Sequence, residues 1–331
     1  MQKLTAAPVD VHWHSCLPIY ASDQFLKSEG HLFGWVGGMD AQERLVCVLP
    51  YTIIRKPGFH LVRFRTATIP VLGELSLEEE TAFLDAVVGY FRSSGADMII
   101  PSGNTAIFRT YPDGAVAAPY GTYIKNLEQP EERLSGELRK TFRQNIRKAL
   151  EQGVEIKSGI EYLDISYTII TQTMKRSGAS FKTQIEFKRT ISGLGEHVKI
   201  FVAEHQGVIQ ACMIAPFSEY AAYNCYSGTR AEPVLGAMHL LHWEAIRQFR
   251  SMGVKRFDFQ GVRIDPEKGS KQDGIANYKK GFGGEFVKGY TWKYALRPLK
   301  AVGYSLAVRL LMGGDIVDLE RHKLSRVREQ A

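Results

Sequence analysis

Apolar and polar residues alternate along residues 60–69, with the two-residue period of a strand that has one buried face. Segments 32–37, 45–54, 96–100 and 120–124 are predicted as further strands, and 45–54 is a long run of strand-forming residues. Between segments 60–69 and 96–100, apolar positions recur every three or four residues up to Gly95, which predicts an amphipathic helix. Ser76 and Glu79 have the spacing of a capping box at the start of this helix.

The second half of the chain repeats this order of elements. Three strands, a helix that ends at glycine, a strand and a return strand are predicted over 32–125 and again over 198–295. In the second copy a strand at 154–157 and helices near 161–177 and 184–196 come first. Its long helix, at 234–252, has an apolar face made of Leu235, Met238, Leu241, Ala245, Phe249 and Met252.

A strand, two helices, three antiparallel strands, a helix and a strand are the order of elements in a GNAT acyltransferase domain. Two copies imply duplicated halves that share an interface. We therefore predict an α/β (α+β) protein with two GNAT-like domains, each a mixed, largely antiparallel twisted sheet flanked by helices. The expected boundaries are 1–128 for the first domain, 129–297 for the second and 298–331 for a helical extension.

Two interpretations of the extension remain open. The basic residues between Arg297 and Arg309 accompany an apolar series of Leu299, Val302, Leu306 and Leu310. Such a helix can rest on an anionic membrane, but we expect it to pack against the core of the second domain.

The 331 residues carry a net charge of +7, which favours polyanionic partners such as nucleic acid, phosphorylated molecules or an anionic membrane surface. No segment has the apolar core of a signal peptide or the length of a membrane span. We expect a cytoplasmic protein, with peripheral contact to the inner face of the membrane as a further possibility. His12, His14 and Cys16 do not have the spacing of a common zinc motif, so no metal site is predicted.

Residues 138–150 combine an apolar ridge with a basic one. Leu138, Phe142, Ile146 and Leu150 form the apolar series, and every charged residue from Arg139 to Lys148 is basic. A solvated helix face usually mixes charges of both signs, because pairs four residues apart stabilise it. The one-sign ridge therefore favours a phosphate-binding edge, with a solvated helix face as the alternative.

The segment with the most candidate functional residues runs from Val254 to Tyr290. Phe257 and Phe259 alternate with polar residues, as in a strand, and a charged loop follows Gly261. The adjacent lysines 279 and 280 then stand among aromatic residues and glycines, a combination that suits an anionic or acyl-bearing ligand approached closely by backbone. A strand, a surface loop and a glycine-capped helix end explain the same residues without any ligand.

Two separate segments resemble the Fem family, whose members are aminoacyl-tRNA-dependent peptidyltransferases that build peptidoglycan cross-bridges with two GNAT-type domains. The first comprises Phe257-Asp258-Phe259-Gln260-Gly261 and, after the charged loop, Tyr278-Lys279-Lys280-Gly281-Phe282-Gly283-Gly284-Glu285. It looks like the C-terminal signature of the family. The second, residues 138–149, resembles the segment between the two Fem domains. The long helical hairpin of some Fem proteins has no counterpart, because residues 161–197 are too few.

The resemblance implies aminolysis, in which a free amine attacks the ester carbonyl of an aminoacyl donor. This reaction needs aligned reactants, removal of a proton and stabilisation of an oxyanion. The essential lysine of the family falls in the motif that contains Lys279 and Lys280, and we expect Lys279 first to supply the positive charge. Asp258 is expected to accept a proton or to orient Lys279, although a structural ion pair is an equal alternative.

Further residues are expected to bind the substrates. They are Lys140, Arg143, Arg147, Asn224, Tyr226, Arg230, Gln260 and Tyr278. The arginine side chains suit phosphate oxygens, and Asn224 and Tyr226 are expected to line the acceptor cleft, although strand packing also accounts for them.

The donor is expected to be aminoacyl-tRNA, with no bound cofactor. GNAT enzymes usually hold the coenzyme A pyrophosphate at the N-terminus of the helix after the fourth strand, on a glycine-rich loop. In residues 228–237 the glycine does not stand at the position it has in that loop, and Glu232 would face the phosphates. The expected acceptor is a peptidoglycan precursor, a muropeptide linked to lipid or nucleotide.

Two other functions remain open at this stage. One is an acyl-CoA-dependent N-acyltransferase acting on an amino sugar or a surface polysaccharide precursor. The other is a non-catalytic RNA- or membrane-binding protein on the same scaffold.

Overall fold

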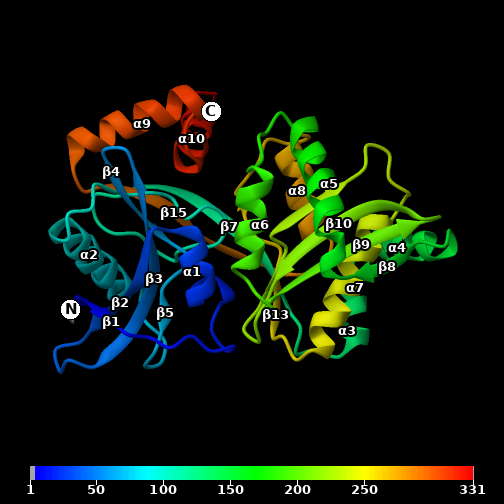
Figure 1. Ribbon diagram of the computed structural model, residues 1–331, viewed down its shortest axis with the longest axis horizontal. Coiled ribbons are helices and arrows are strands. Elements are labelled where there is room, and N and C mark those ends of the chain that lie inside the picture. The colour runs from blue at the N-terminus through cyan, green and yellow to red at the C-terminus, as the bar shows by residue number, and fades with distance from the viewer. Residues whose placement is uncertain (1–3, 331) are drawn as a thin grey trace.

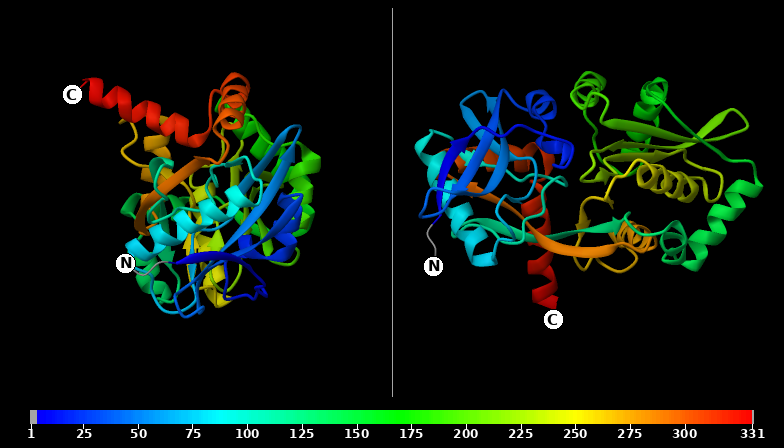
Figure 2. Two further views of the ribbon diagram at one scale, coloured as in Figure 1. Left: turned by 90° about the vertical axis from the view of Figure 1, so that its left-hand side faces the viewer. Right: turned by 90° about the horizontal axis from the view of Figure 1, so that it is seen from below.

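The computed structural model describes residues 4–330 and consists of two lobes joined by two long strands (Figure 1). These strands, β7 (Val116–Asn126) and β15 (Glu285–Ala295), pair antiparallel from Val116 opposite Lys293 to Ile124 opposite Glu285. Figure 2 shows this ribbon extending from one lobe to the other. A strand from the end of the chain therefore completes the sheet of the first lobe.

The first lobe is a mainly antiparallel sheet with a helix packed on it. Its elements are β1 (Thr5–Val9), η1 (Ile19–Ala21), α1 (Asp23–Glu29), β2 (Leu32–Met39), β3 (Leu45–Lys56), β4 (Phe59–Phe64), β5 (Ile69–Pro70), α2 (Leu77–Ser93) and β6 (Met98–Ile99). The strand order is β1-β2-β3-β4-β6, and β15 continues the sheet beside β6. Ser76 and Glu79 form the predicted capping box, and Phe83, Val87 and Phe91 of α2 are buried against the sheet.

The second lobe has a four-stranded sheet, ordered β12-β10-β9-β8, between two layers of helices. Its elements are α3 (Glu131–Gly136), α4 (Lys140–Glu151), β8 (Glu155–Ser158), η2 (Ile160–Tyr162), α5 (Leu163–Arg176), α6 (Gln184–Ser192), β9 (Val198–His205), β10 (Val208–Pro216), β11 (Ala222–Tyr223), β12 (Tyr226–Thr229), α7 (Ala237–Ser251), β13 (Arg256–Asp258), β14 (Val262–Arg263) and α8 (Lys271–Lys280). The expected mixed α/β fold is confirmed.

The two sheets separate between β11 and β12. β11 pairs in parallel with β13 of the large sheet, whereas β12 pairs with β10 of the small one. At the break, the backbone N–H of Asn224 donates to the Asp258 carbonyl, and that of Cys225 donates to the Ile214 carbonyl. The two residues therefore bond to different sheets, which diverge from this point.

Some expected apolar faces differ in detail. Leu150 and Leu235 are exposed, and Met252 lies beyond the end of α7 and is also exposed. Leu138, Phe142 and Ile146 are buried as predicted, and Ala149 takes the place expected for Leu150. Leu235 and Met252 lie outside α7 (Ala237–Ser251), so the helical period that placed them on its apolar face does not apply to them.

The chain ends in two helices, α9 (Pro298–Met312) and α10 (Ile316–Gln330). The expected packing of this extension against the second domain is wrong for α9. Its buried residue Ala301 lies with Leu61, Met98 and Ile100 of the first lobe, because β15 delivers the chain beside β6. No helix among residues 4–330 is both long and apolar enough to cross a bilayer.

Candidate active site

A cavity of about 710 Å³ lies where the two sheets separate. Residues from β11–β12, α5, α7, α8 and the loop after β13 line it, together with Asn104, Tyr120 and Ile316. Five residues of the predicted site are among those lining it. They are Asn224, Tyr226, Gln260, Tyr278 and Lys279. The tertiary fold thus brings side chains at the junction of β11 and β12 together with side chains of the Val254–Tyr290 segment.

Lys279 is in the last turn of α8, and its ammonium group points at the loop after β13. Its Nζ donates to the carbonyl of Gly261 at 2.9 Å and also to the carbonyl of Gln260. Burial lowers the pKa of Lys279 to about 8, and the negative charge of Asp258 opposes this shift. At neutral pH the side chain is therefore a cation held by backbone oxygens.

Asp258 lies behind the wall of the cavity and holds the loop that binds Lys279. Its Oδ1 accepts from Thr122 Oγ1 at 2.5 Å and from the backbone N–H of Gln260 at 2.7 Å. Gln260 has a φ of 53°, a conformation that costs energy for a residue with a Cβ. Burial raises the pKa of Asp258, while the Thr122 and Gln260 bonds oppose that change. The carboxylate is thus placed to stabilise the turn that presents the two carbonyls.

A buried histidine, His242 on α7, also lines the cavity. Its Nδ1 lies 3.0 Å from the Met238 carbonyl, so this nitrogen carries the hydrogen. Its Nε2 then accepts from Asn224 Nδ2 at 3.0 Å. Burial lowers the pKa of His242 to about 4, which keeps the ring neutral. Tyr278 joins the group, since its hydroxyl donates to the same Met238 carbonyl at 3.2 Å.

Cys225 and Tyr226 complete the wall on the strand side. Burial raises the pKa of the Cys225 thiol to about 11, so it is not a thiolate nucleophile at neutral pH. The ring of Tyr226 packs against Phe181 and has the Lys182 ammonium 5.6 Å from its centre. Tyr226 thus lies between the cavity and the contact between the lobes.

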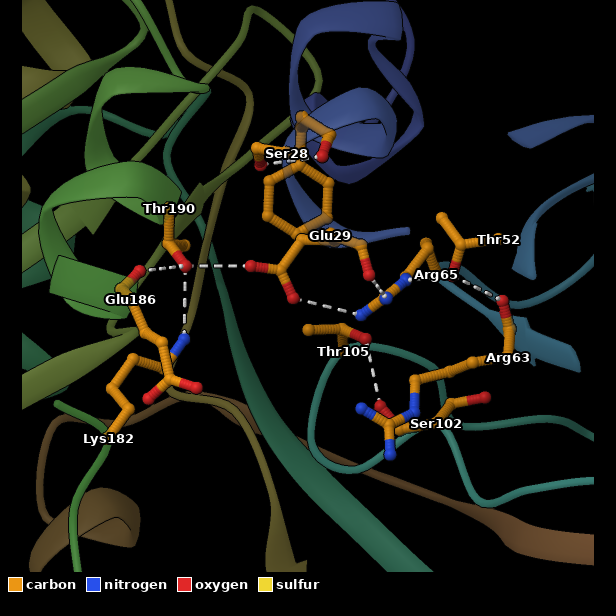
Figure 3. Close-up of polar contacts among 11 residues, drawn as sticks. Ser28, Glu29, Thr52, Arg63, Arg65, Ser102, Thr105, Lys182, Glu186 and Thr190 are labelled. Atoms are coloured by element: carbon orange, nitrogen blue, oxygen red, sulfur yellow. Dashed lines mark hydrogen bonds and ion pairs between the residues drawn. The ribbon is translucent and has the colours of Figure 1, made fainter. Parts of the chain in front are cut away.

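Figure 3 shows that contact, a polar cluster built from both lobes. Arg65, directly after β4, donates to the Glu29 carboxylate at 3.2 Å and to the Glu29 carbonyl at 2.8 Å. From the other lobe, Thr190 Oγ1 donates to the same carboxylate at 2.7 Å, and Lys182 Nζ donates to Thr190 Oγ1 at 3.1 Å. Glu29 is therefore the common acceptor that fixes α6 against the first lobe.

The remaining predicted site residues do not line the cavity. Asp258 lies behind its wall, and Lys140 and Lys280 are exposed. Arg143 donates to the Gly136 carbonyl at 3.0 Å and so satisfies the C-terminal end of α3. Arg147 pairs with Glu151 at 3.2 Å, and Arg230 donates to the Ile209 carbonyl at 2.8 Å. Phosphate binding by these residues stays a prediction.

The N-terminus of α7, where a GNAT enzyme would hold a pyrophosphate, is covered by α4. Gly236 precedes α7 with a φ of 87°, and a Cβ built on it would lie 2.0 Å from the Asn145 carbonyl oxygen. Gly236 and Ala237 are both buried. A backbone carbonyl thus occupies the space next to this helix end, and an oxygen with partial negative charge is a poor neighbour for phosphate.

Two residues that line the cavity, His242 and Cys225, are not among the predicted site residues. His242 falls three residues before Ala245 and four after Met238, on the face of α7 that was expected to be apolar. A histidine at such a position was the available signal. No signal in the sequence marks Cys225, because only the separation of the two sheets distinguishes it from other cysteines in strands.

The chain thus has a GNAT-like fold with a cavity where its two sheets separate. Residues 114–207 match the FemAB family, and the chain superposes on the crystal structure of FemX with a TM-score of 0.63. The two are 14% identical over 89% of this chain and 95% of FemX. The predicted resemblance to the Fem family is confirmed by these two findings.

Two further solved structures share the fold. The C-terminal domain of an Agrobacterium fabrum protein assigned as a lysylphosphatidylglycerol synthetase has a TM-score of 0.52 and 12% identity, over 86% of this chain and 91% of that one. A conserved Bacteroides thetaiotaomicron protein of unknown function has a TM-score of 0.50 and 10% identity, over 82% and 88%. No curated protein sequence matches the chain significantly.

Proposed function

We propose that the chain is an aminoacyltransferase that moves an amino acid from aminoacyl-tRNA to the stem peptide of a peptidoglycan precursor. The observation that carries the proposal is the Lys279 ammonium at the cavity, held by the Gln260 and Gly261 carbonyls. The match to the FemAB family agrees with this class of reaction. So does the Agrobacterium relative, which is named for the synthesis of an aminoacylated lipid.

The proposed chemistry uses the one N–H of Lys279 that the two carbonyls leave over, since an ammonium has three. The acceptor amine attacks the ester carbonyl, and the carbonyl oxygen becomes an oxyanion that Lys279 stabilises. The new C–N bond forms, the C–O bond to the ribose breaks, and the amine proton ends on the released hydroxyl. Asp258 acts as a positioning residue through the backbone of Gln260, and Asn224 and Tyr278 line the space for the acceptor.

The covered end of α7 favours charged tRNA over coenzyme A as donor. In the usual GNAT arrangement the pyrophosphate needs free backbone N–H groups at this helix end. Here Gly236 abuts the Asn145 carbonyl instead. A donor without a pyrophosphate avoids this conflict, whereas acyl-CoA would require α4 to move.

The test is transfer of a labelled amino acid from charged tRNA to a muropeptide precursor, with and without ribonuclease treatment of the donor. We expect ribonuclease to abolish transfer and Lys279→Met to lower the rate by about 10²- to 10³-fold, the cost of losing one oxyanion donor. Lys288→Met, an exposed lysine outside the cavity, is the matched control. Ribonuclease-resistant transfer from acetyl-CoA, or full activity of Lys279→Met, would refute the proposal.

A further inference from the structure

The helix α9 carries a row of exposed apolar side chains. Leu299 is 91% exposed, Val302 67%, Leu306 57% and Leu310 78%. They follow one another by three, four and four residues, so they lie on one face of the helix. Contiguous apolar surface of this kind on a folded protein marks a site of interaction.

The opposite face of α9 holds the helix firmly to the first lobe. Ala301 is buried, and the ring of Tyr304 packs on Phe59 with 5.6 Å between ring centres. Lys300 Nζ donates to the Gly58 carbonyl at 3.0 Å and forms an ion pair with Asp97. These contacts fix the rotation of the helix, so the apolar row faces outward. In Figure 1, α9 lies along the outside of the first lobe, above β4.

The acidic and basic groups around this helix differ in how they are paired. α9 contains no acidic residue, and three carboxylates in or just before the first turns of α10 are held in ion pairs. Asp315 and Asp318 both bind the buried Lys293, the first at 2.8 Å, and Glu320 binds Arg263 at 2.6 Å. In contrast, two basic residues next to the apolar row are exposed and have no ion-pair partner among the side chains that the structure describes. They are Arg309 and Arg321.

We propose that α9 docks on an anionic lipid surface, with the apolar row in the outer part of the lipid layer and the basic residues on the headgroups. A row of apolar side chains on a convex helix with cations beside it is the arrangement of helices that lie in a membrane interface. With 15 residues, α9 is about 22 Å long. This is too short to span a bilayer, so it lies flat.

The C-terminal end of the docked helix is close in the chain to the cavity. Ile316, the first residue of α10, lines the same cavity as Lys279. Only Gly313, Gly314 and Asp315 separate it from the end of α9. Lipid binding itself is independent of this connection. It also does not depend on the proposed acyl transfer and is measured without it.

The test is co-sedimentation of the full chain with vesicles of phosphatidylcholine alone or of phosphatidylcholine and phosphatidylglycerol in equal parts. We expect binding to the anionic vesicles to be at least about tenfold tighter and to weaken with salt. The double variant Leu306→Glu/Leu310→Glu should lose about tenfold or more in vesicle affinity. Ile185→Glu on α6, a solvent-exposed site at 82%, should bind as the unaltered chain does.

Two results would overturn the proposal. One is the absence of binding to anionic vesicles, or equal binding by the double variant. The other is a dimer in analytical ultracentrifugation that the double variant dissociates, since a second copy of the chain would then cover the row. Because both altered leucines are exposed, circular dichroism should show an unchanged fold.

Discussion

Replacing Lys279 with methionine tests the environment of this side chain through protein stability, without any substrate. In the folded chain the pKa of Lys279 falls from 10.5 to about 8 because of burial. A change of one pKa unit corresponds to about 1.4 kcal/mol, so the shift is worth about 3 kcal/mol. Between these two pKa values the unfolded chain holds the proton and the folded chain has released it. The free energy of unfolding of the unaltered chain therefore rises with pH across this window.

The assay is urea unfolding of the unaltered chain and of Lys279→Met between pH 7 and pH 10.5. Every other titrating group is common to both proteins, so the difference between their unfolding free energies isolates Lys279. This difference should shift by about 3 kcal/mol in favour of the unaltered chain as the pH rises. A difference that does not vary with pH would show that Lys279 titrates as it does in water, and the electrostatic reasoning about the cavity would be wrong.

Three further predictions concern stability. Gly236→Ala should lower the free energy of unfolding by about 3 kcal/mol, because the added Cβ meets the Asn145 carbonyl. The control is Gly253→Ala, which has a similar φ of 78° but open space around it and should cost about 1 kcal/mol. Equal losses in urea unfolding would contradict the close contact of α4 and α7. Phe282→Ala, at a fully buried ring, should cost about 3–5 kcal/mol by the same assay, and a loss below 1 kcal/mol would exclude a packed aromatic core there. Burial raises the pKa of Glu29, but Arg65, Lys182, the Thr190 hydrogen bond and Arg63 together outweigh it, so the pKa lies below its usual value. Glu29→Gln should therefore destabilise the fold at pH 7, and this loss should disappear as the pH falls through the folded pKa of Glu29. A loss that persists in acid would rule out the ionic contact.

The local elements were predictable because they depend on neighbours in the chain. The period of apolar residues indicated the strands and the long helices, and Ser76 with Glu79 located the start of α2. Phe257 and Phe259, the aromatic residues of the alternating segment 255–260, are both buried. The same stretch carried the resemblance to the Fem family and singled out Lys279, which lies at the cavity.

Other features arise only from contacts between residues far apart in the sequence. Lys279 and Lys280 are adjacent in one motif, yet helical rotation turns the first toward the Gly261 carbonyl and the second toward solvent. Arg143 lies in the basic ridge, but its bond to the Gly136 carbonyl is visible only once α3 and α4 are folded against each other.

The sequence by itself thus determined the order of the elements and the residue types available for chemistry, because both follow from local periodicity and motif. Only the tertiary structure decided which of these side chains share a cavity. It brought His242 to Asn224 and left the leucines of α9 without cover. The physical reason is that burial and hydrogen bonding depend on which surfaces meet. Here β15 determines which surfaces of the two lobes meet, because it crosses from the second lobe into the first.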